Sequence, residues 1–334
     1  MAKRRFTDGW ITKLSSLTSQ DFEDLALEAF HYQATFNPLY RSYLDLLRKD
    51  PKQIRYIQDI PFLPIRFFKN QTIKTEEWEP VTTFTSSSTT GQRPSQHHLL
   101  SAELYEFVTR QGFKHFYEEP SEYCILALLP SYLERSGSSL VYMAHHFIRQ
   151  SRYKESGFFL HDLTALATQL EDCQARKIPT LLIGVSFALL DLAEQYPMQL
   201  GDTIVMETGG MKGRRKEITR MELHQILKTA FDVPQIHSEY GMTELLSQGY
   251  SKGDGLFYPS PSMRVLGRDI TDPLSTSKLG QTAALNIVDL ANINTISFIS
   301  TDDIGQVYTD HSFRVLGRLD NSDVRGCNLM VADM

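Results

Sequence analysis

Two short strings far apart in the chain carry residue types that could handle a phosphate group. The first is a run of hydroxyl side chains that ends in glycine: Ser86, Ser87, Ser88, Thr89, Thr90 and Gly91. Their hydroxyls, together with backbone N–H groups of the turn, can point at phosphate oxygens. Alone the run is a weak signal, because serine, threonine and glycine together usually form a solvated turn.

The second string is Tyr240-Gly241-Met242-Thr243-Glu244. It could supply a ring for stacking, a backbone that a ligand can approach closely, a hydroxyl donor and a carboxylate ligand for Mg²⁺. Both strings follow stretches with strand character. Together, and in this order, they predict an enzyme that activates its substrate with a nucleotide.

The elements around these strings predict an α/β fold. The first 80 residues contain helical apolar faces, one through Phe22 to Phe30 with Thr18 or Ser19 as its cap, and one through Tyr40 to Leu47. From about residue 81 to 240 strands and helices alternate, which indicates a mostly parallel sheet covered by helices on both faces. The predicted strands are Val81–Thr85, Tyr123–Leu129, Thr180–Ile183, Thr203–Glu207 and Pro234–Ser238.

The helices expected between these strands have apolar faces through Leu163 to Cys173 and through Leu223 to Ala230, the latter preceded by a Thr219–Glu222 capping box. After about residue 255 short strands follow: Arg264–Leu266, Ala284–Val288, Thr295–Ser300 and Phe313–Gly317. We therefore expect a helical part over 1–80, an α/β core over 81–254 and a smaller β-rich part over 255–334. Ligands of open parallel sheets bind at the carboxyl ends of strands, where both strings would meet.

Composition excludes several classes of protein. The net charge of −6 over 334 residues argues against general nucleic-acid binding. Three cysteines without a C-x-x-C pair argue against a disulfide framework or a zinc ribbon and fit a cytoplasmic protein. No apolar run has the length of a membrane span, and no signal-peptide core follows the basic Lys3-Arg4-Arg5.

The two strings resemble motifs of the adenylate-forming ligase superfamily, and the resemblance continues downstream. Thr301-Asp302-Asp303 is similar to its T-G-D segment, with Asp302 where glycine is usual. Gly317-Arg318-Leu319-Asp320 is similar to its G-R-x-D hinge, and Arg325-Gly326 continues that pattern. This resemblance implies the fold of the superfamily's N-terminal domain, with a smaller β-rich subdomain.

A closer resemblance is to the acyl-protein synthetases of bacterial luciferase systems, the long-chain-fatty-acid component ligases. The segments that carry it are Ser87–Gln92 with Ser95, Leu129–Arg135, Glu207–Gly210 with Lys212–Arg214, and Asp320–Asp323 leading to Arg325–Cys327. It implies that the protein activates a fatty or other carboxylic acid with ATP and Mg²⁺, and transfers the acyl group to its own cysteine. An acyl reductase or acyl-carrier protein would then be the partner.

The sequence departs from this pattern at two points. Ser88 stands where the phosphate loop usually has glycine, so a left-handed backbone there would be strained. The chain ends at Met334, shortly after the hinge motif, so we expect the large C-terminal lid domain and its catalytic lysine to be missing. These departures keep open a catalytically degenerate binding or scaffold protein.

The resemblance also implies a role for each site residue. Thr89, Thr90 and Gly91 would hold phosphate, and Gly209 and Gly210 would let the backbone approach adenine. Tyr240 would stack on adenine, although a tyrosine beside a strand is more often a core residue. Thr243 would bond the α-phosphate and Glu244 would hold Mg²⁺, while Asp303 would accept the ribose hydroxyls and Arg318 would reach ribose or phosphate.

The three cysteines separate by context. Cys124 lies in an apolar strand and Cys173 on an apolar helix face, so both are expected in the core. Cys327 lies in a polar terminal stretch beside Arg325, whose charge favours a thiolate. Without the resemblance it reads as an inert terminal cysteine; with it, Cys327 is the expected acyl acceptor.

Other readings remain at this stage. An acyl-CoA ligase would use the same adenylation step with coenzyme A as the acceptor. Gly184-Val185-Ser186-Phe187-Ala188 is one glycine short of a nucleophile elbow, which would make Ser186 the nucleophile of a serine acyl hydrolase or transferase, although a serine there is usually a helix cap. The pairs His97-His98 and His145-His146 are poor joint metal ligands, because neighbouring residues of one element point apart.

Overall fold

A computed structural model describes residues 6–87, 93–130, 134–135, 137–209 and 218–319 of the chain. The sequence-predicted site residues that lie outside these ranges are Ser88, Thr89, Thr90, Gly91, Gly210 and Cys327.

The larger of two main sheets has seven strands, in the order β10-β9-β8-β7-β6-β4-β5. From β8 to β5 all neighbours are parallel, whereas β9 and β10 are antiparallel additions. The predicted mostly parallel sheet is confirmed. Its strands are β4 (Cys124–Leu128), β5 (Gly157–Phe158), β6 (Thr180–Gly184), β7 (Ile204–Glu207), β8 (His237–Tyr240), β9 (Gly249–Ser251) and β10 (Tyr258–Pro259).

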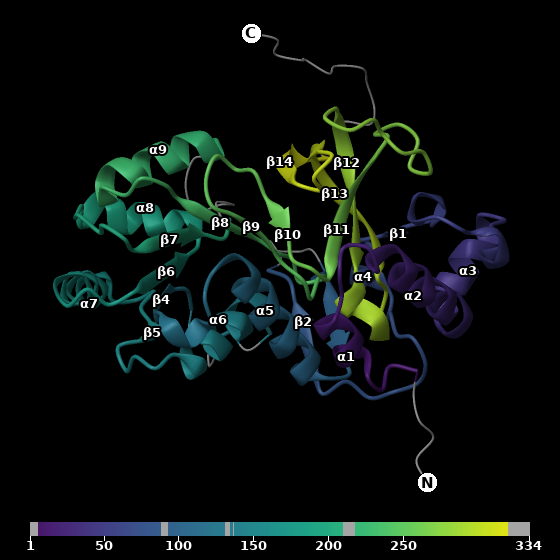
Figure 1. The fold of residues 1–334 in the computed structure, drawn as a ribbon, viewed down its shortest axis with the longest axis horizontal. Helices are drawn as coiled ribbons and strands as arrows, with labels where there is room; N and C mark the ends of the chain where they lie inside the picture. The colour runs from purple at the N-terminus through teal and green to yellow at the C-terminus, as the bar shows by residue number, and fades with distance from the viewer. Residues whose placement is uncertain (1–5, 88–92, 131–133, 136, 210–217, 320–334) are drawn as a thin grey trace.

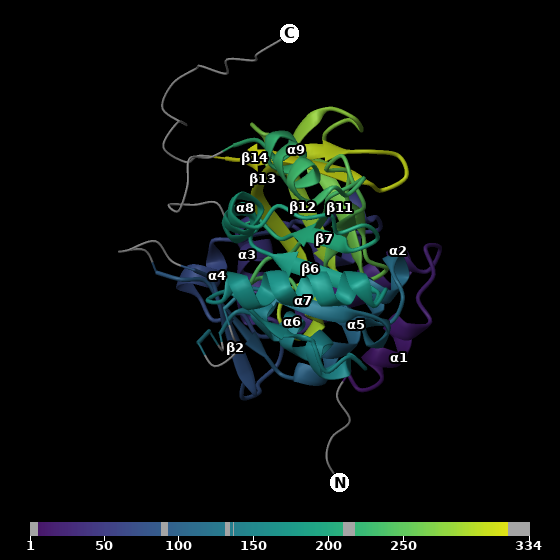
Figure 2. The ribbon, with the colours of Figure 1, turned by 90° about the vertical axis from the view of Figure 1, so that its left-hand side faces the viewer.

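Helices cover both faces of this sheet, because successive side chains of a strand point to opposite faces. In β4, Ile125 and Ala127 belong to the core beneath α5 (Ala102–Phe116) and α6 (Ser139–Gln150). Leu126 and Leu128 belong to a second core, with α7, α8 and α9. Figures 1 and 2 show these three helices along the sheet: α7 (Leu163–Ala175), α8 (Ser186–Gln195) and α9 (Arg220–Phe231).

The second sheet has five strands and stands beside β8 and β9 (Figure 1). Antiparallel pairs join β11 to β12, β12 to β13 and β13 to β14, and the short β1 from the N-terminal part pairs parallel with β13. Its strands are β1 (Leu63–Pro64), β11 (Met263–Arg268), β12 (Thr282–Asp289), β13 (Phe298–Val307) and β14 (Phe313–Arg318).

The N-terminal helices pack beside this second sheet (Figure 1). Trp10 Nε1 donates to the Leu290 carbonyl at 2.8 Å, and Gln33 Nε2 donates to the carbonyls of Asn292 and Ile293. Both contacts reach η4 (Leu290–Asn294), the short 3-10 helix that follows β12. The helices are α1 (Trp10–Ser15), α2 (Phe22–Phe36), α3 (Pro38–Leu46) and α4 (Phe67–Asn70). The division into three parts stays a prediction.

The sequence-predicted elements form, with differences at several boundaries. The strand expected from Pro234 begins at His237, since a proline cannot donate to a central ladder. The strand expected over Thr295–Ser300 begins at Phe298 and continues to Val307, because Thr295 ends η4. The strand expected at residue 81 is β2 (Thr82–Thr85), which within the described residues pairs with β3 (Gln96–Leu99) in a hairpin outside the large sheet.

Helix α2 begins after Asp21, later than a Thr18 or Ser19 cap predicts. The Thr18 hydroxyl donates to the Asp21 carboxylate and accepts from the Asp21 backbone N–H at 3.3 Å, so it closes the turn before the helix.

Other local predictions hold: the Thr219–Glu222 capping box is present at the start of α9. Among the described residues, none of the helices combines the length and apolar character that crossing a membrane requires.

Candidate active site

The two opening strings of the sequence meet in the structure through Ser95 and Glu244. Ser95 follows the hydroxyl-rich run and closes its hairpin: its backbone N–H donates to Ser86 Oγ at 2.9 Å, and its carbonyl accepts from Ser86 N at 3.2 Å. The Ser95 side chain in turn hydrogen-bonds the carboxyl of Glu244. The loop end of the β2–β3 hairpin therefore lies against the last residue of the Tyr240–Glu244 string.

A buried histidine hydrogen-bonds the backbone of the same string. His97, on β3, places Nδ1 2.9 Å from the Thr243 carbonyl and Nε2 3.2 Å from the Thr295 hydroxyl. The carbonyl can only accept, so Nδ1 carries the proton. Burial lowers the pKa of His97 to about 4, which keeps the imidazole neutral. Its neighbour His98 points away, to Thr83 Oγ1 at 2.8 Å.

The chain after Glu244 is anchored by the buried carboxylate of Asp289. That carboxylate accepts from the backbone N–H groups of Leu246 at 2.7 Å and Ser247 at 3.0 Å, and from the Ser247 hydroxyl at 2.6 Å. Asn292 Nδ2 donates to the Glu244 carbonyl at 2.9 Å. The string therefore runs between the two sheets with its downstream end fixed to the end of β12.

Glu244 is buried, with 8% of its surface exposed. Burial raises the pKa of its carboxyl, while the Ser95 hydrogen bond and the positive charges of Arg318 and Lys69 act in the opposite direction. Among the described residues, Glu244 forms no direct ion pair, so a cation brought by a ligand would stabilise its ionised form.

Tyr240, Asp303 and Arg318 form a contiguous group beside this carboxyl. The Tyr240 hydroxyl donates to Asp303 Oδ2 at 2.8 Å, and Arg318 Nε donates to Oδ1 at 2.9 Å. Asp303 and Arg318 are register partners on β13 and β14, which explains their alignment. The Tyr240 ring packs edge-on against Phe257 and Phe313. The motifs that resembled the T-G-D and hinge segments thus come together with the Tyr240 string.

The turn after β7 is held by Glu207, which is 2% exposed. Its carboxylate accepts from Gly209 N at 2.7 Å and from Arg220 Nε at 3.0 Å, and His224 Nε2 lies 3.7 Å away. Burial raises the pKa of Glu207, but His224 and the Arg220 charge outweigh it and bring the pKa to about 2. Gly209 has a φ of +72°, a left-handed conformation that favours glycine.

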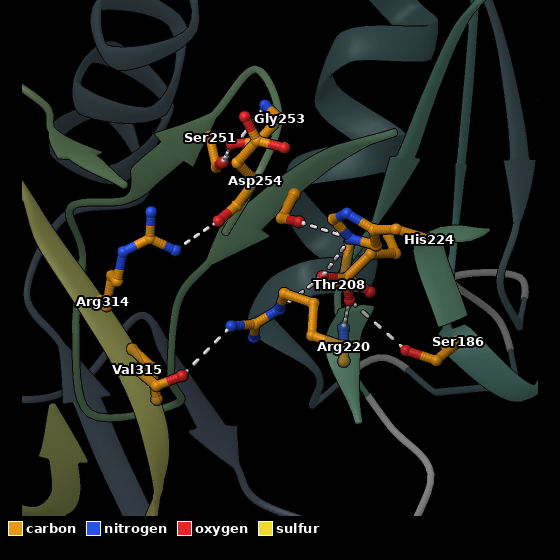
Figure 3. Close-up of polar contacts among 12 residues, drawn as sticks. Ser186, Thr208, Arg220, His224, Ser251, Gly253, Asp254, Arg314 and Val315 are labelled. Carbon is orange, nitrogen blue, oxygen red and sulfur yellow. Dashed lines mark hydrogen bonds and ion pairs between the residues drawn. The ribbon is translucent and has the colours of Figure 1, made fainter. Parts of the chain in front are cut away.

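Arg220 connects this turn to the hinge strand. Its Nη1 donates to the Val315 carbonyl on β14 at 3.3 Å, and its guanidinium lies over the Phe257 ring, 5.0 Å from the centroid. Figure 3 shows Arg220 reaching toward Val315, with His224 and Ser186 around the same carboxylate. The arginine also explains how a carboxylate this deeply buried stays ionised.

Ser186 does not have the surroundings of a serine nucleophile. Its hydroxyl is 2% exposed and donates to Glu207 Oε2 at 3.3 Å (Figure 3). A serine nucleophile needs a general base to accept its proton, and the Glu207 carboxylate that Ser186 contacts, with a pKa of about 2, is a poor base. Ser186 is the first residue of α8, whose N-cap is Val185. The geometry therefore gives the hydrolase alternative no support.

The described residues contain no group of three or more His, Cys, Asp or Glu that could hold a metal ion. His145 stacks on Phe158, whereas its neighbour His146 bonds Gln150 at 2.9 Å, so this pair points apart as expected. A metal at this site would need ligands from a bound molecule in addition to Glu244.

Cys124 and Cys173 lie in the core as predicted, with their sulfur atoms 3.7 Å apart. Burial raises the pKa of the Cys124 thiol to about 12, so it is protonated and unreactive at neutral pH. Neither thiol is accessible to an acyl donor.

The site residues that the structure describes form two neighbouring groups. Tyr240, Asp303 and Arg318 are in mutual contact, Glu244 lies within electrostatic range of Tyr240 and Arg318, and Gly209 lies on the Glu207 turn. Gly241 and Ser87 are exposed, and Thr243 is half-buried. Sequence reasoning gave no role to the supporting residues His97 and Arg220. Their partners lie on other elements, so spacing along the chain carries no signal for them.

No family model matches the chain, and no curated protein matches it. Several solved structures do match the chain. ATP-bound MatB from Rhodopseudomonas palustris is 15% identical over 71% of this chain, with a TM-score of 0.51. A 2-hydroxyisobutyryl-CoA ligase in complex with 2-HIB-AMP and CoA, in its thioesterification state, is 12% identical over 96% of this chain, with a TM-score of 0.66.

The chain spans 47% of the length of MatB and 73% of that of the 2-hydroxyisobutyryl-CoA ligase. A third structure, the same ligase with 2-HIB-AMP after adenylation, gives a TM-score of 0.64 at 11% identity, over 89% of this chain and 67% of its own. At these low sequence identities, the structural similarity supports a shared fold and nothing more specific. The protein has the α/β fold seen in adenylate-forming ligases, with a smaller β sheet packed beside a larger, mostly parallel one.

Proposed function

We propose that the protein uses ATP to activate a carboxylic acid as an acyl adenylate. The observation that carries the proposal is the convergence of four separated motifs at one junction: Ser86 and Ser95 on the hairpin, the Tyr240–Glu244 string, Asp303 and Arg318. The fold likeness to ligases bound to ATP or to an acyl adenylate supports it.

In the first step a carboxylate oxygen of the acid attacks the α-phosphorus of ATP. The bond from that phosphorus to the bridging oxygen breaks, and pyrophosphate leaves with the electron pair. Two anions must approach each other, so the site has to supply positive charge and hydrogen-bond donors. In this proposal Thr243 donates to the α-phosphate, and Arg318 contributes charge from β14.

A Mg²⁺ ion would suit Glu244. Such an ion is commonly bound by one or two carboxylates, with phosphate oxygens and waters as its remaining ligands. Glu244 offers a single buried carboxyl, and the raised pKa from burial shows that a positive partner would be favourable there. When bound, the ion would reduce the repulsion between the acid and the triphosphate.

Asp303 and Tyr240 would orient the nucleoside. The Asp303 carboxylate would accept hydrogen bonds from the ribose hydroxyls, and the Tyr240 ring would stack on adenine. The Glu207 cluster, which is Glu207 with Arg220, His224 and Ser186, would hold the Gly209 turn close to the base. This proposal also includes five residues that only the sequence motifs identify: Ser88, Thr89, Thr90, Gly91 and Gly210.

In the second step we propose that the Cys327 thiolate attacks the acyl carbon of the adenylate. A thioester forms, and AMP leaves with the electrons of the broken carbon–oxygen bond. The enzyme would be an acyl-protein synthetase that passes the acyl group to a reductase or carrier protein, and the family resemblance points to a fatty acid. Coenzyme A is the alternative acceptor, and the fold likeness to a CoA ligase supports it.

The test of the first step is pyrophosphate release with ATP, Mg²⁺ and a panel of carboxylic acids. Release should require both the acid and the ion. Glu244→Gln should lower it by about 100-fold or more, since a neutral amide is a poor ligand for Mg²⁺. Glu171→Gln, an exposed residue on α7, is the matched control and should behave as wild type. A protein that releases no acid-dependent pyrophosphate would be a binding or scaffold protein instead.

The test of the second step is intact-mass spectrometry of the acylated protein. Cys327→Ser should keep acid-dependent pyrophosphate release and lose the hydroxylamine-sensitive acyl adduct. Cys124→Ser and Cys173→Ser should keep the adduct, because both thiols are buried. Acyl transfer to free coenzyme A with Cys327 dispensable would identify an acyl-CoA ligase.

A further inference from the structure

One carboxyl group beside the proposed active site has no partner. Glu239 precedes Tyr240 on β8, so its side chain points to the opposite face of the sheet from the Tyr240–Asp303 contact. Its register partner is Tyr250 on β9, and the face they share is covered by α5. In the part of the chain that the structure describes, no hydrogen bond or ion pair involves this carboxyl.

The Glu239 carboxyl lies over the backbone of Gly241. A methyl group built on the Gly241 α-carbon would collide with Glu239 Oε1 and would lie 3.7 Å from Gln248 Cγ. Gly241 itself is exposed, and Glu239 is partly exposed. Any ligand that rests on the exposed backbone of the Tyr240–Glu244 string therefore meets this carboxyl.

The surroundings of Glu239 contain further polar atoms without partners. Gln248 Oε1, the Tyr250 hydroxyl and Ser260 Oγ are buried and unpaired within the described residues. One N–H of the Gln248 amide donates to the Leu246 carbonyl at 3.0 Å, and its Oε1 stays available as an acceptor. Ser260 N donates to the Gln248 carbonyl at 2.9 Å, which places these residues side by side. The Tyr250 and Ser260 hydroxyls can each donate or accept. Unpaired buried polar groups cost free energy that a ligand with a complementary hydrogen-bonding group would recover.

No positive charge from the described residues balances the Glu239 carboxyl. The titratable groups near it include His237 on β8, Tyr250 on β9, Tyr105 on α5 and Tyr117, which bonds His237, and Glu207 lies on the neighbouring strand β7. Lys252 Nζ lies over the Tyr117 ring, 5.3 Å from its centroid. Burial, and next the Lys252 charge, lower the pKa of His237 to about 4, so its imidazole is neutral. Burial and the Glu207 charge raise the pKa of Glu239 to about 8. A cationic ligand would favour the ionised carboxylate.

We propose that Glu239 and Gln248 form a subsite for a hydrogen-bond-donating group on the acid substrate, with an ammonium bound in preference to a hydroxyl. The substrate class is then an amino-substituted carboxylic acid. This inference rests on the proposed adenylation function and narrows its substrate. Gln248 Oε1 and the ionised Glu239 carboxylate are acceptors, so they suit a donor such as an ammonium better than the anionic phosphates or the reacting carboxylate.

The experiment compares acids that differ only in one group. ATP–pyrophosphate exchange is measured with straight-chain acids of two lengths that carry a hydrogen, a hydroxyl or an amino group, at carbon 2 or at the far end. The best amino acid should exceed its unsubstituted counterpart in kcat/KM by about tenfold or more, as expected for a specific polar contact. The hydroxy acid should fall between them.

Glu239→Gln tests the assignment without changing side-chain size. It should bring the ratio of kcat/KM for the amino acid over that for the unsubstituted acid, measured within the variant, close to one, since the amide keeps the shape but not the charge. Glu239→Asp keeps the charge but moves it back by one methylene, so it should weaken the preference partially. This variant replaces Glu239→Gln in the test if Glu239→Gln does not fold. Tyr250→Phe removes only the neighbouring hydroxyl and should leave most of the preference.

The outcomes separate the two proposals. Exchange that is equal for amino and unsubstituted acids, or a preference that survives Glu239→Gln, overturns the subsite while the adenylation function stands. Absence of exchange with every acid overturns the adenylation function itself. In that case isothermal titration of wild type and Glu239→Gln with the amino acids alone decides the subsite: binding that requires Glu239 supports it, and equal or no binding overturns it.

Discussion

The Tyr240 hydroxyl and the Asp303 carboxylate are joined by a 2.8 Å hydrogen bond across the junction of the two sheets. Arg318 occupies the other oxygen of the same carboxylate at 2.9 Å. Each oxygen of Asp303, the expected acceptor for ribose, therefore already accepts one bond from a protein side chain. A carboxylate oxygen can accept a second bond, so a ribose hydroxyl would share an oxygen with Tyr240 or Arg318, or displace one of them.

Tyr240→Phe should therefore weaken ATP binding little or even strengthen it, because the ring remains for stacking and one oxygen of Asp303 is released. Tyr240→Ala should raise the Kd for ATP by about tenfold or more, since aromatic stacking on a base is worth about 1–3 kcal/mol. Isothermal titration with ATP measures both. Equal loss in the two variants would show that the hydroxyl, not the ring, contributes to binding.

Ser95→Ala should move the acidic limb of the pH profile for pyrophosphate release to higher pH. The Ser95 hydrogen bond favours the ionised form of Glu244, whose pKa burial already raises, so its loss raises that pKa further. The Ser95 backbone bonds to Ser86 remain, which preserves the hairpin. Ser86→Ala is the control, as it removes the hairpin contact and should leave the limb in place.

His97 should make the protein sensitive to mild acid. The pKa of His97 is about 4 in the folded protein against an ordinary value of 6.5, so the unfolded chain binds its proton first as pH falls. Stability from this residue is complete above pH 6.5 and is lost as pH falls toward 4. Urea unfolding at several pH values measures the slope.

The matched variants at this position are His97→Asn and His97→Phe. Asparagine can keep the donor to the Thr243 carbonyl without titrating, so its acid slope should be smaller. Phenylalanine should cost roughly 1–3 kcal/mol at neutral pH, because it leaves buried polar groups unpaired. An unchanged slope in the asparagine variant would assign the acid sensitivity to another group.

Arg220→Gln should destabilise the protein by roughly 2–4 kcal/mol, since it leaves the buried Glu207 carboxylate without its cation. The effect should shrink as pH falls from 4.5 toward about 2, because the carboxyl of the variant can protonate while the wild-type carboxylate loses its advantage over the unfolded chain. Arg314→Gln is the control: it removes a half-buried arginine that bonds the Asp254 carbonyl (Figure 3) and should change stability by less than about 1 kcal/mol. Similar losses in both variants would argue against a special role for the Glu207 cluster.

The sequence predicted the order of strands and helices well, because apolar periodicity reports burial directly. The alternation in β4, with Ile125 and Leu126 in opposite cores, is visible as an uninterrupted apolar run. The motif residues Tyr240, Glu244, Asp303 and Arg318 were also identified from their local strings, and their roles remain proposals.

Supporting contacts were not predictable from one sequence. His97 looked like half of a weak histidine pair, yet its partner is a backbone carbonyl at Thr243. Glu239 follows the last residue of the strand expected over Pro234–Ser238 and received no role from its type or spacing; only the lack of a hydrogen-bond or ion-pair partner within the described structure makes it notable. Such features depend on which elements pack together, and local spacing does not encode that.

The contacts of η4 also set the order in which the chain can complete its fold. Trp10 and Gln33 are synthesised long before their hydrogen-bond acceptors, which are carbonyls of residues 290, 292 and 293. Domains generally fold as units during synthesis. Here α1 and α2 must wait for most of the described chain. During translation they expose an apolar face that chaperones can recognise.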